Sequence, residues 1–236
     1  MKIWDISQVL RPGLPVWPGD TDFAFERTWK MEDGSPVNVG RMTMSTHSGT
    51  HADAPLHYSA DGADAASMSI EPYLGTCIVV DARGVQGEID IGDLPDLDYA
   101  NRVLFRTWDA FPHDEWRSDW LPIAPETIEW LAAQGVVLIG TDAPSVDPQE
   151  SKTMDAHLAV LKHDMRILEG LVLDDVPEGL YELIAPPLKV GGGDAGLCRA
   201  VLRELHGLQC VAFLGEVGTE RTIDLNANVT FNSDII

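Results

Sequence analysis

The stretch His47-Ser-Gly-Thr-His-Ala-Asp-Ala-Pro-Leu-His57 contains three of the seven histidines of the chain and one aspartate. His47 and His51 are four residues apart, a spacing that places two metal ligands on one helix face in metalloproteases with the pattern His-Glu-x-x-His. A helix does not fit here, because Gly49 is unfavourable inside a helix and Pro55 disfavours the α conformation at the residue before it. The run at 37–46 also reads as a strand, so we expect an extended segment.

An extended segment directs these side chains towards a shared site. Positions 47, 51, 53 and 57 are all odd, so a period of two points the three histidines and Asp53 to the same side. A straight strand would still separate His47 from His51 by roughly 13 Å, too far to share one ion. The chain must therefore bend, and Gly49 and Pro55 are suited to bending it.

The polar side chains of this segment are suited to a metal centre. His47, His51 and Asp53 provide two imidazoles and a carboxylate, the ligands expected for zinc or a similar divalent ion that keeps an open position for water. The carboxylate of Asp53 could also bridge two ions. His57 is then free to move protons, since an imidazole with a pKa around 6.5 can accept a proton from water and return it to a leaving group. The alternative is that these histidines are polar surface or turn residues.

A second group of candidate ligands lies further along the chain. His157 stands at the start of an expected helix, and Glu169 interrupts an aliphatic run that reads as a strand. A carboxylate buried in such a strand needs a partner such as a cation. The alternatives are a Glu169 that faces solvent and a His157 that is an ordinary helix-face residue. We expect the remaining histidines, at positions 113, 163 and 206, at the surface.

The charge of the chain argues against two classes of partner. Sixteen Lys and Arg against 38 Asp and Glu give a net charge of -22, which repels the phosphates of nucleic acids and the headgroups of anionic lipids. No apolar run has signal-peptide or membrane-spanning length, so we expect a cytoplasmic protein. The three cysteines are widely spaced and odd in number, and they indicate neither a disulfide framework nor a Cys-x-x-Cys zinc site.

The order of elements predicts one domain of the α/β or α+β class with a mixed sheet. Aliphatic runs bounded by Gly or Asp predict strands at 76–81, 102–108, 136–140 and 167–173. A helix at 125–134 is predicted by Pro125 at its start and Gly135 at its end. Two further helices are expected from apolar residues on one face, at 154–163 with Leu158 and Leu161, and at 196–206 with Leu197, Val201, Leu202 and Leu205.

Together these residues resemble a known family. The pattern His-x-Gly-Thr-His-x-Asp-x-Pro-x-His at 47–57 is similar to the signature of the cyclase-like metal-dependent hydrolases. Further segments resemble the bacterial kynurenine formamidases within that family, chiefly Pro15-Val-Trp-Pro-Gly-Asp20, Gly34-Ser-Pro-Val-Asn38 and Ile167-Leu-Glu-Gly170 with the residues that follow it. The resemblance extends from about residue 3 to residue 206. It implies a hydrolase domain at 1–206 and a C-terminal extension at 207–236.

This resemblance implies a fold and a reaction. The fold is an α/β domain of the swivelling β/β/α type with a mixed sheet, and the assembly is a homodimer. The reaction is the hydrolysis of a small-molecule substrate, N-formyl-L-kynurenine, to L-kynurenine and formate. The implied cofactors are two zinc ions per subunit, with manganese or another divalent ion as the alternative.

The resemblance also implies a role for each site residue. His47, His51 and Asp53 hold one zinc ion, while Asp53 bridges to a second zinc ion that Glu169 and His157 also hold. His57 corresponds to the proton donor and acceptor of the family. Trp17 corresponds to an aromatic residue that contacts the substrate; its alternative role is simple packing under a Pro-rich loop.

Two features depart from the family pattern, and two other functions stay open. The family segment Ala-Leu-Pro-Leu-Lys reads Ala185-Pro-Pro-Leu-Lys189 here and is followed by Gly191-Gly-Gly-Asp194, which puts the nearby pocket wall in doubt. Residues 207–236 extend beyond the expected end, as an extra strand at 209–214 or a disordered tail. The other functions are the opening of a cyclic amide such as isatin, and metal binding without catalysis.

Overall fold

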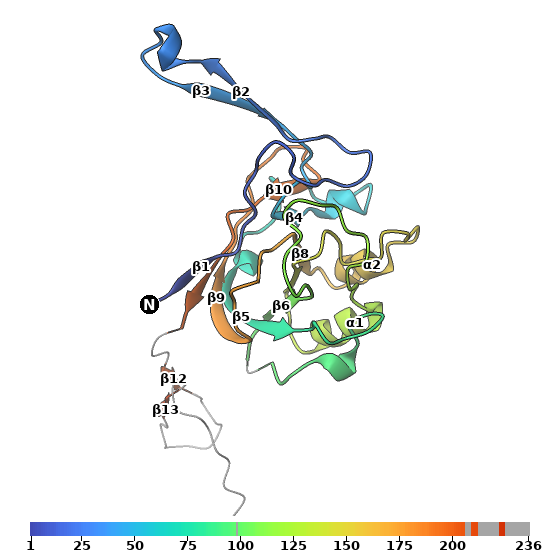
Figure 1. Ribbon diagram of the computed structural model, residues 1–236. Helices are drawn as coiled ribbons and strands as arrows, with labels where there is room; N and C mark the ends of the chain where they lie inside the picture. Colours follow the sequence, from blue (N-terminus) through green and yellow to red (C-terminus); the bar gives the residue numbers. More distant parts are fainter. Residues whose placement is uncertain (98, 206–208, 212–221, 225–236) are drawn as a thin grey trace, which may run out of the picture.

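A mixed sheet of nine strands forms the framework of the protein (Figure 1). The computed structural model describes residues 1–97, 99–205, 209–211 and 222–224. The strand order is β1-β11-β9-β5-β6-β7-β8-β4-β10; β5 to β8 run parallel, and every other neighbouring pair is antiparallel. The strands are β1 (Ile3–Asp5), β4 (His51–Asp53), β5 (Leu74–Asp81), β6 (Arg102–Arg106), β7 (Leu138–Thr141), β8 (Arg166–Glu169), β9 (Gly179–Ile184), β10 (Ala195–Leu197) and β11 (Val201–Glu204).

Two α-helices, α1 (Pro125–Ala133) and α2 (Asp155–Lys162), cover one face of this sheet. We call the apolar layer beneath them the helix-side core; strand residues such as Val103, Phe105, Ile139 and Ile167 pack there against Ile128 and Val160. The described part of the chain also contains four short 3-10 helices: Met31–Asp33, Pro55–His57, Glu71–Tyr73 and Ile91–Asp93.

A second apolar layer, the inner core, fills the opposite face. Leu104, Leu138 and Leu168 point there, so neighbouring residues of one strand enter opposite cores, as the alternation of side chains in a strand requires. Leu183 of β9 and Leu202 of β11 belong to the same layer although their strands lie towards the other end of the sheet. The sheet therefore curls around the inner core. The fold is mixed α/β, as predicted.

Most of the expected elements are present. The predicted strands correspond to β5, β6, β7 and β8, although β8 ends at Glu169 and is shorter than expected. The helix predicted at 125–134 is α1, with Pro125 at its start, and the one predicted at 154–163 is α2. The apolar face assigned to α2 is wrong. Leu158 is 44% exposed, and the buried residues are Ala156, His157, Ala159 and Val160.

The helix predicted at 196–206 is wrong. This segment forms β10 and β11, and β11 lies between β1 and β9, where Leu202 is fully buried. Strands on both sides satisfy its backbone hydrogen bonds, and this tertiary pairing outweighs the helical spacing of its apolar residues. At the C-terminal end, β12 (Gln209–Val211) pairs with β13 (Thr222–Asp224) in a separate two-stranded sheet. The predicted strand at 209–214 is thus confirmed at 209–211, while 212–214 lie outside the described residues, as does His206.

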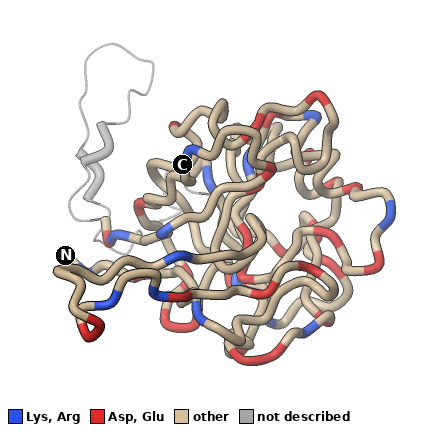
Figure 2. The backbone as a smooth tube through the Cα atoms, turned by 90° about the horizontal axis from the view of Figure 1, so that it is seen from above, with Lys and Arg blue, Asp and Glu red and all other residues tan. Residues whose placement is uncertain are grey.

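A β-hairpin stands away from the sheet (Figure 1). Its strands are β2 (Ala24–Trp29) and β3 (Val39–Thr43), and every residue of both strands is exposed. The strand expected at 37–46 is thus confirmed over its centre. Figure 2 shows acidic residues outnumbering basic ones along the backbone, in keeping with the net charge. Within the described part of the chain, no helix is long and apolar enough to cross a membrane.

Candidate metal centre

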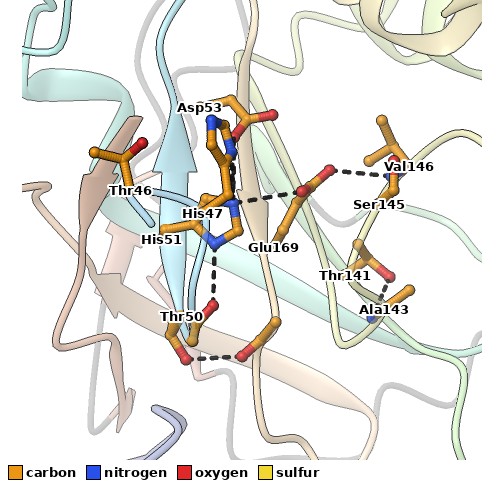
Figure 3. A network of polar contacts seen from close by, with 12 residues as sticks. Thr46, His47, Thr50, His51, Asp53, Thr141, Ala143, Ser145, Val146 and Glu169 are labelled. Atoms are coloured by element: carbon orange, nitrogen blue, oxygen red, sulfur yellow. Dashed lines mark hydrogen bonds and ion pairs between the residues drawn. The ribbon is translucent and has the colours of Figure 1, made fainter. Parts of the chain in front are cut away.

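The pairing of β4 with β8 brings the first candidate ligands together. His51 lies opposite Glu169 and Asp53 lies opposite Ile167, so both polar residues of β4 share the face of Glu169. Because Ile167 belongs to the helix-side core and Ala52 to the inner core, this is the face that the helices cover. His51 Nε2 lies 3.3 Å from Asp53 Oδ1 and 3.5 Å from Glu169 Oε2 (Figure 3).

The bend predicted at Gly49 adds His47 to this group. Gly49 has a φ of +71°, a left-handed conformation that favours glycine. The chain folds back there, and His47 Nδ1 lies 3.1 Å from Asp53 Oδ1 and 3.2 Å from His51 Nε2. A Cβ at Gly49 would stand 2.6 Å from Leu10 Cδ2, so the turn is also crowded.

The other two histidines come from short helices. Pro55 begins the 3-10 helix that carries His57, whose ring centroid lies 4.1 Å from that of His47 and 5.8 Å from that of His157. His157 lies in the first turn of α2, and its Nε2 is 3.3 Å from Asp53 Oδ2 and 3.8 Å from Glu169 Oε1. The structure thus gathers all six polar residues that the sequence analysis selected.

Burial and unpaired polar atoms test whether this group fits a metal ion. His51, Asp53, His157 and Glu169 are 2%, 0%, 1% and 3% exposed. Asp53 Oδ1 and His47 Nε2 are buried without a hydrogen-bond partner. The ion pairs of Asp53 and Glu169 described in the structure are all with histidines, and two buried carboxylates need positive charge. Imidazole nitrogens and carboxylate oxygens are ligands of zinc and related ions, so the residues fit a divalent cation.

The pKa shifts show how strongly the group requires positive charge. Burial opposes charging of His51, but contacts with Asp53 and Glu169 outweigh it and raise the His51 pKa to about 10. Burial likewise opposes charging of His157, and contacts with Asp147 and Asp53 raise its pKa to about 10. Burial raises the pKa of Glu169, and the charge of Asp53 raises it further. A divalent cation would replace these protons on the histidines.

His57 differs from the other histidines of the site. It is the exposed member of the group. Desolvation lowers its pKa, and although the charge of Asp53 opposes this, His47 and His157 lower it further. His57 is therefore a neutral imidazole at neutral pH and can accept a proton.

Two sets of three residues each have ligand atoms within 4.8 Å of one another: His47, Asp53 and His57, and His51, Asp53 and Glu169. Asp53 belongs to both sets. This geometry is compatible with two neighbouring ions that share Asp53, and it also brings His57 within reach of an ion.

Trp17 belongs to an aromatic cluster that the sequence analysis did not identify. Its ring centroid lies 5.4 Å from that of Trp116 and 5.7 Å from that of Trp120, and its side chain is 38% exposed. Trp120 Nε1 donates a hydrogen bond to the carbonyl of Asp147, at 2.9 Å. The cluster therefore lies beside the loop that contacts His157.

Two further carboxylates contact the site histidines, and the sequence analysis missed both in this role. Asp147 Oδ2 lies 2.5 Å from His157 Nδ1. Asp194 Oδ2 lies 3.4 Å from His47 Nε2, and Asp194 Oδ1 accepts a hydrogen bond from Thr46. The only sequence signal for Asp194 was the Gly191–Gly193 departure that precedes it, and this segment lies against the end of β4, since the Ala54 N–H donates to the Asp194 carbonyl.

Comparison with known proteins places the chain in a family. The family model described as "Putative cyclase" matches residues 4–148. A kynurenine formamidase of Erythrobacter litoralis is 79% identical over 204 residues, which are 86% of this chain and 94% of that protein. A kynurenine formamidase of Maricaulis maris is 58% identical over 206 residues, 86% of this chain and 99% of that protein.

Solved structures agree with this placement. A potential metal-dependent hydrolase with cyclase activity superimposes with a TM-score of 0.74 at 30% identity, over 86% of this chain and 99% of that one. Isatin hydrolase A of Labrenzia aggregata superimposes with a TM-score of 0.72 at 25% identity, over 85% and 93% of the two chains. The chain therefore belongs to the cyclase family, in the branch that includes these kynurenine formamidases.

Proposed function

We propose that the protein is a metal-dependent hydrolase that cleaves N-formyl-L-kynurenine to L-kynurenine and formate. The observation that carries this proposal is the group of two buried histidines, two buried carboxylates and the half-buried His47, with a neutral histidine at its open side. The similarity to kynurenine formamidases over 86% of the chain supports the substrate.

The proposed cofactors are two zinc ions, one held by His47, His51 and Asp53 and the other by Asp53, Glu169 and His157. The shared position of Asp53 between the outer ligands supports this division. Divalent ions there would lower the pKa of water towards about 7 and polarise the formyl oxygen. Manganese is the alternative, because His and carboxylate ligands also accept it.

The residues of the chain supply the proton transfer and the positioning. His57 takes the proton from the attacking water and delivers it to the departing aryl nitrogen, so that the amine leaves as a neutral group. Trp17 presents an exposed ring that can stack on the aniline ring of the substrate. Glu169 is held in place by a hydrogen bond from the Val146 N–H to Oε1, at 3.1 Å.

The test is one preparation assayed in three metal states: stripped with a chelator, reloaded with zinc and reloaded with manganese. We expect the absorbance change of N-formylkynurenine hydrolysis only after reloading. Isatin is assayed in parallel, because the likeness to isatin hydrolase A favours opening of a cyclic amide as the second candidate function. If isatin were turned over faster than N-formylkynurenine, isatin would be the better assignment of the substrate. Ion uptake without turnover of either would indicate metal binding without catalysis.

A homodimer is part of the proposal, and the hairpin β2–β3 supports it. Phe25 and Met42 lie opposite each other on its two strands and are 53% and 52% exposed. An isolated two-stranded hairpin is marginally stable in water, so a contact with a second copy would stabilise it. We expect Phe25→Ser with Met42→Ser to shift the mass measured by light scattering towards the monomer. Ile70→Ser, an equally exposed position off the hairpin, is the control and should leave the mass unchanged.

The remaining parts of the proposal concern organisation and location. The likeness to the structure of a potential metal-dependent hydrolase supports the swivelling β/β/α arrangement. A hydrolase domain at 1–206 is supported by relatives that match 204 or 206 residues and are themselves covered over 94% to 99%. A chain ending at residue 206 should therefore retain hydrolysis, and loss of activity would assign 207–236 to the domain. The proposed location is the cytoplasm, which cell fractionation tests.

A further inference from the structure

Asp147 contacts the side of His157 that faces away from the other candidate ligands. We propose that Asp147 is a positioning residue that fixes His157 in the tautomer whose Nε2 can bind a metal ion. This inference rests on the proposed metal centre and adds to it a residue that the ligand set does not contain. It concerns the orientation of one ligand, and it can be tested without measuring hydrolysis.

The carboxylate of Asp147 is buried, and all its described contacts are with residues at the start of α2. It is 4% exposed. Oδ2 contacts His157 Nδ1 at 2.5 Å and accepts the His157 backbone N–H at 3.1 Å, while Oδ1 accepts the Ala156 N–H at 3.0 Å. One side chain therefore holds both the backbone and the ring of His157.

The main chain of Asp147 is itself anchored on two sides. Its N–H donates to Ser145 Oγ at 3.2 Å, and its carbonyl accepts the indole N–H of Trp120 at 2.9 Å. These two contacts hold the backbone of Asp147 independently of His157. The Ala156 and His157 N–H groups then hold its carboxylate beside the ring.

The chemistry of a carboxylate then determines the tautomer. An ionised Asp accepts hydrogen bonds and donates none, so the proton of the neutral ring must lie on Nδ1. The lone pair is left on Nε2, which points to Asp53 Oδ2 at 3.3 Å and Glu169 Oε1 at 3.8 Å. Because only an unprotonated nitrogen binds a metal ion, Asp147 selects the competent form of His157.

The other two histidines of the proposed ligand set have outer contacts that do not involve Asp147. The ring of His51 contacts the backbone carbonyl of Gly49 through Nδ1 at 3.0 Å, and a side-chain substitution cannot remove that acceptor. His47 Nε2 lies 3.4 Å from Asp194 Oδ2, a separate carboxylate. Removal of the Asp147 carboxylate should therefore weaken the ion at His157 and leave the ion at His47 and His51 nearly unaffected.

The test measures stepwise zinc affinity by competition with a chelator at a temperature well below unfolding. For Asp147→Ala we expect one of the two steps, that of the ion at His157, to lose about 10- to 100-fold in affinity, the usual effect of removing an outer partner of a ligating His. Asp147→Asn should recover part of this loss, because an amide oxygen in the place of Oδ2 can still accept the Nδ1 proton, while the amide nitrogen in the place of Oδ1 no longer accepts the Ala156 N–H. Unchanged affinity of both steps in Asp147→Ala would overturn the inference.

A control variant, Asp155→Ala, distinguishes positioning of the His157 ring from general stabilisation of α2. Asp155 lies in the same first turn of α2, is exposed, and accepts a hydrogen bond only from the Thr153 hydroxyl among its described contacts. Asp155→Ala should lower stability slightly, because it removes a favourable negative charge from the first turn of the helix, and it should leave both affinities within about threefold. An equal loss of affinity in this variant would show that helix support alone is responsible.

A measurement on the unaltered protein complements the variants. In zinc-loaded protein labelled with 15N, we expect the His157 Nδ1 proton to be visible and protected from exchange, with Nε2 as the metal ligand. The reverse assignment would contradict the role of Asp147. Normal ion uptake without hydrolysis would contradict the proposed function alone, whereas hydrolysis with the reverse tautomer would contradict this inference alone.

Discussion

At the scale of single residues, the proton-transfer role of His57 depends on its lowered pKa. Desolvation by the surrounding side chains and the neighbouring histidines lower its pKa, so the ring stays neutral and can accept a proton at pH values below the usual imidazole pKa of 6.5. We expect the acid side of the kcat/KM profile to contain a transition below pH 6.5, because falling pH protonates His57 there. His57→Asn should keep its zinc, lose about 100- to 10,000-fold in turnover, and lose this transition. Full turnover in the variant would remove His57 from the reaction.

Substitution of Asp53 should lower metal content and activity together. It faces His47, His51 and His157, and it belongs to both candidate ligand sets. We expect Asp53→Ala to reduce bound zinc towards zero as measured by atomic absorption, with activity falling in parallel. The exposed Asp61 gives a matched loss of one negative charge, and Asp61→Ala should change neither quantity. A full zinc content in Asp53→Ala would contradict a bridging role.

The site could be predicted from the sequence to the extent that its chemistry is local. Three histidines and Asp53 stand within eleven positions, and Glu169 could be recognised because a carboxylate interrupts an aliphatic strand. Asp147 could not, because its role depends on the loop before α2 folding back, so that Asp147 meets residues that follow it by nine and ten positions in the chain. The division of ligands between ions and the role of Trp17 stay predictions.

At the scale of elements, the sequence predicted those that local signals determine and missed those that depend on pairing with distant strands. The helix α1 follows from Pro125 at its start and Gly135 at its end, which are signals within the chain. Strand β11 has apolar residues at helical spacing, and only the presence of β1 and β9 on either side makes it a strand. The buried face of α2 was also missed, because His157 faces a polar site rather than an apolar core.

The turn at Gly49 brings His47 next to His51 and Asp53, so its backbone conformation bears on ion binding. A residue with a side chain at φ +71° costs about 1–2 kcal/mol, and its Cβ would meet Leu10. Gly49→Ala should therefore lower the free energy of unfolding by at least this amount and weaken the zinc ion held by His47 and His51. Gly191 has ordinary φ and open space around it, so Gly191→Ala serves as the control in denaturant titrations. Unchanged stability in Gly49→Ala would show that the loop relaxes without cost.

At the scale of the whole molecule, the buried site couples folding to pH and to metal. In the metal-free protein the folded-state pKa values of His51 and His157 are about 10, against an ordinary value of 6.5. Protons on these rings therefore stabilise the fold fully below pH 6.5, and this contribution is lost as the pH rises from 6.5 through 10. Zinc ions replace the protons, so the loaded protein should not lose that contribution.

We therefore expect the difference in melting temperature between zinc-loaded and metal-free protein to be larger at pH 9 than at pH 7. Free zinc at about 100 times the Kd of a site adds about 2.7 kcal/mol to the free energy of unfolding at that site, before the pH effect is counted. Asp53→Ala removes the carboxylate that contacts both rings, and it should reduce the dependence on pH in the metal-free state. A difference that shrinks between pH 7 and pH 9 would mean that the carboxylates do not hold these protons in the folded protein. The negative charges of Asp53 and Glu169 in the metal-free protein would then be balanced by groups other than these two rings.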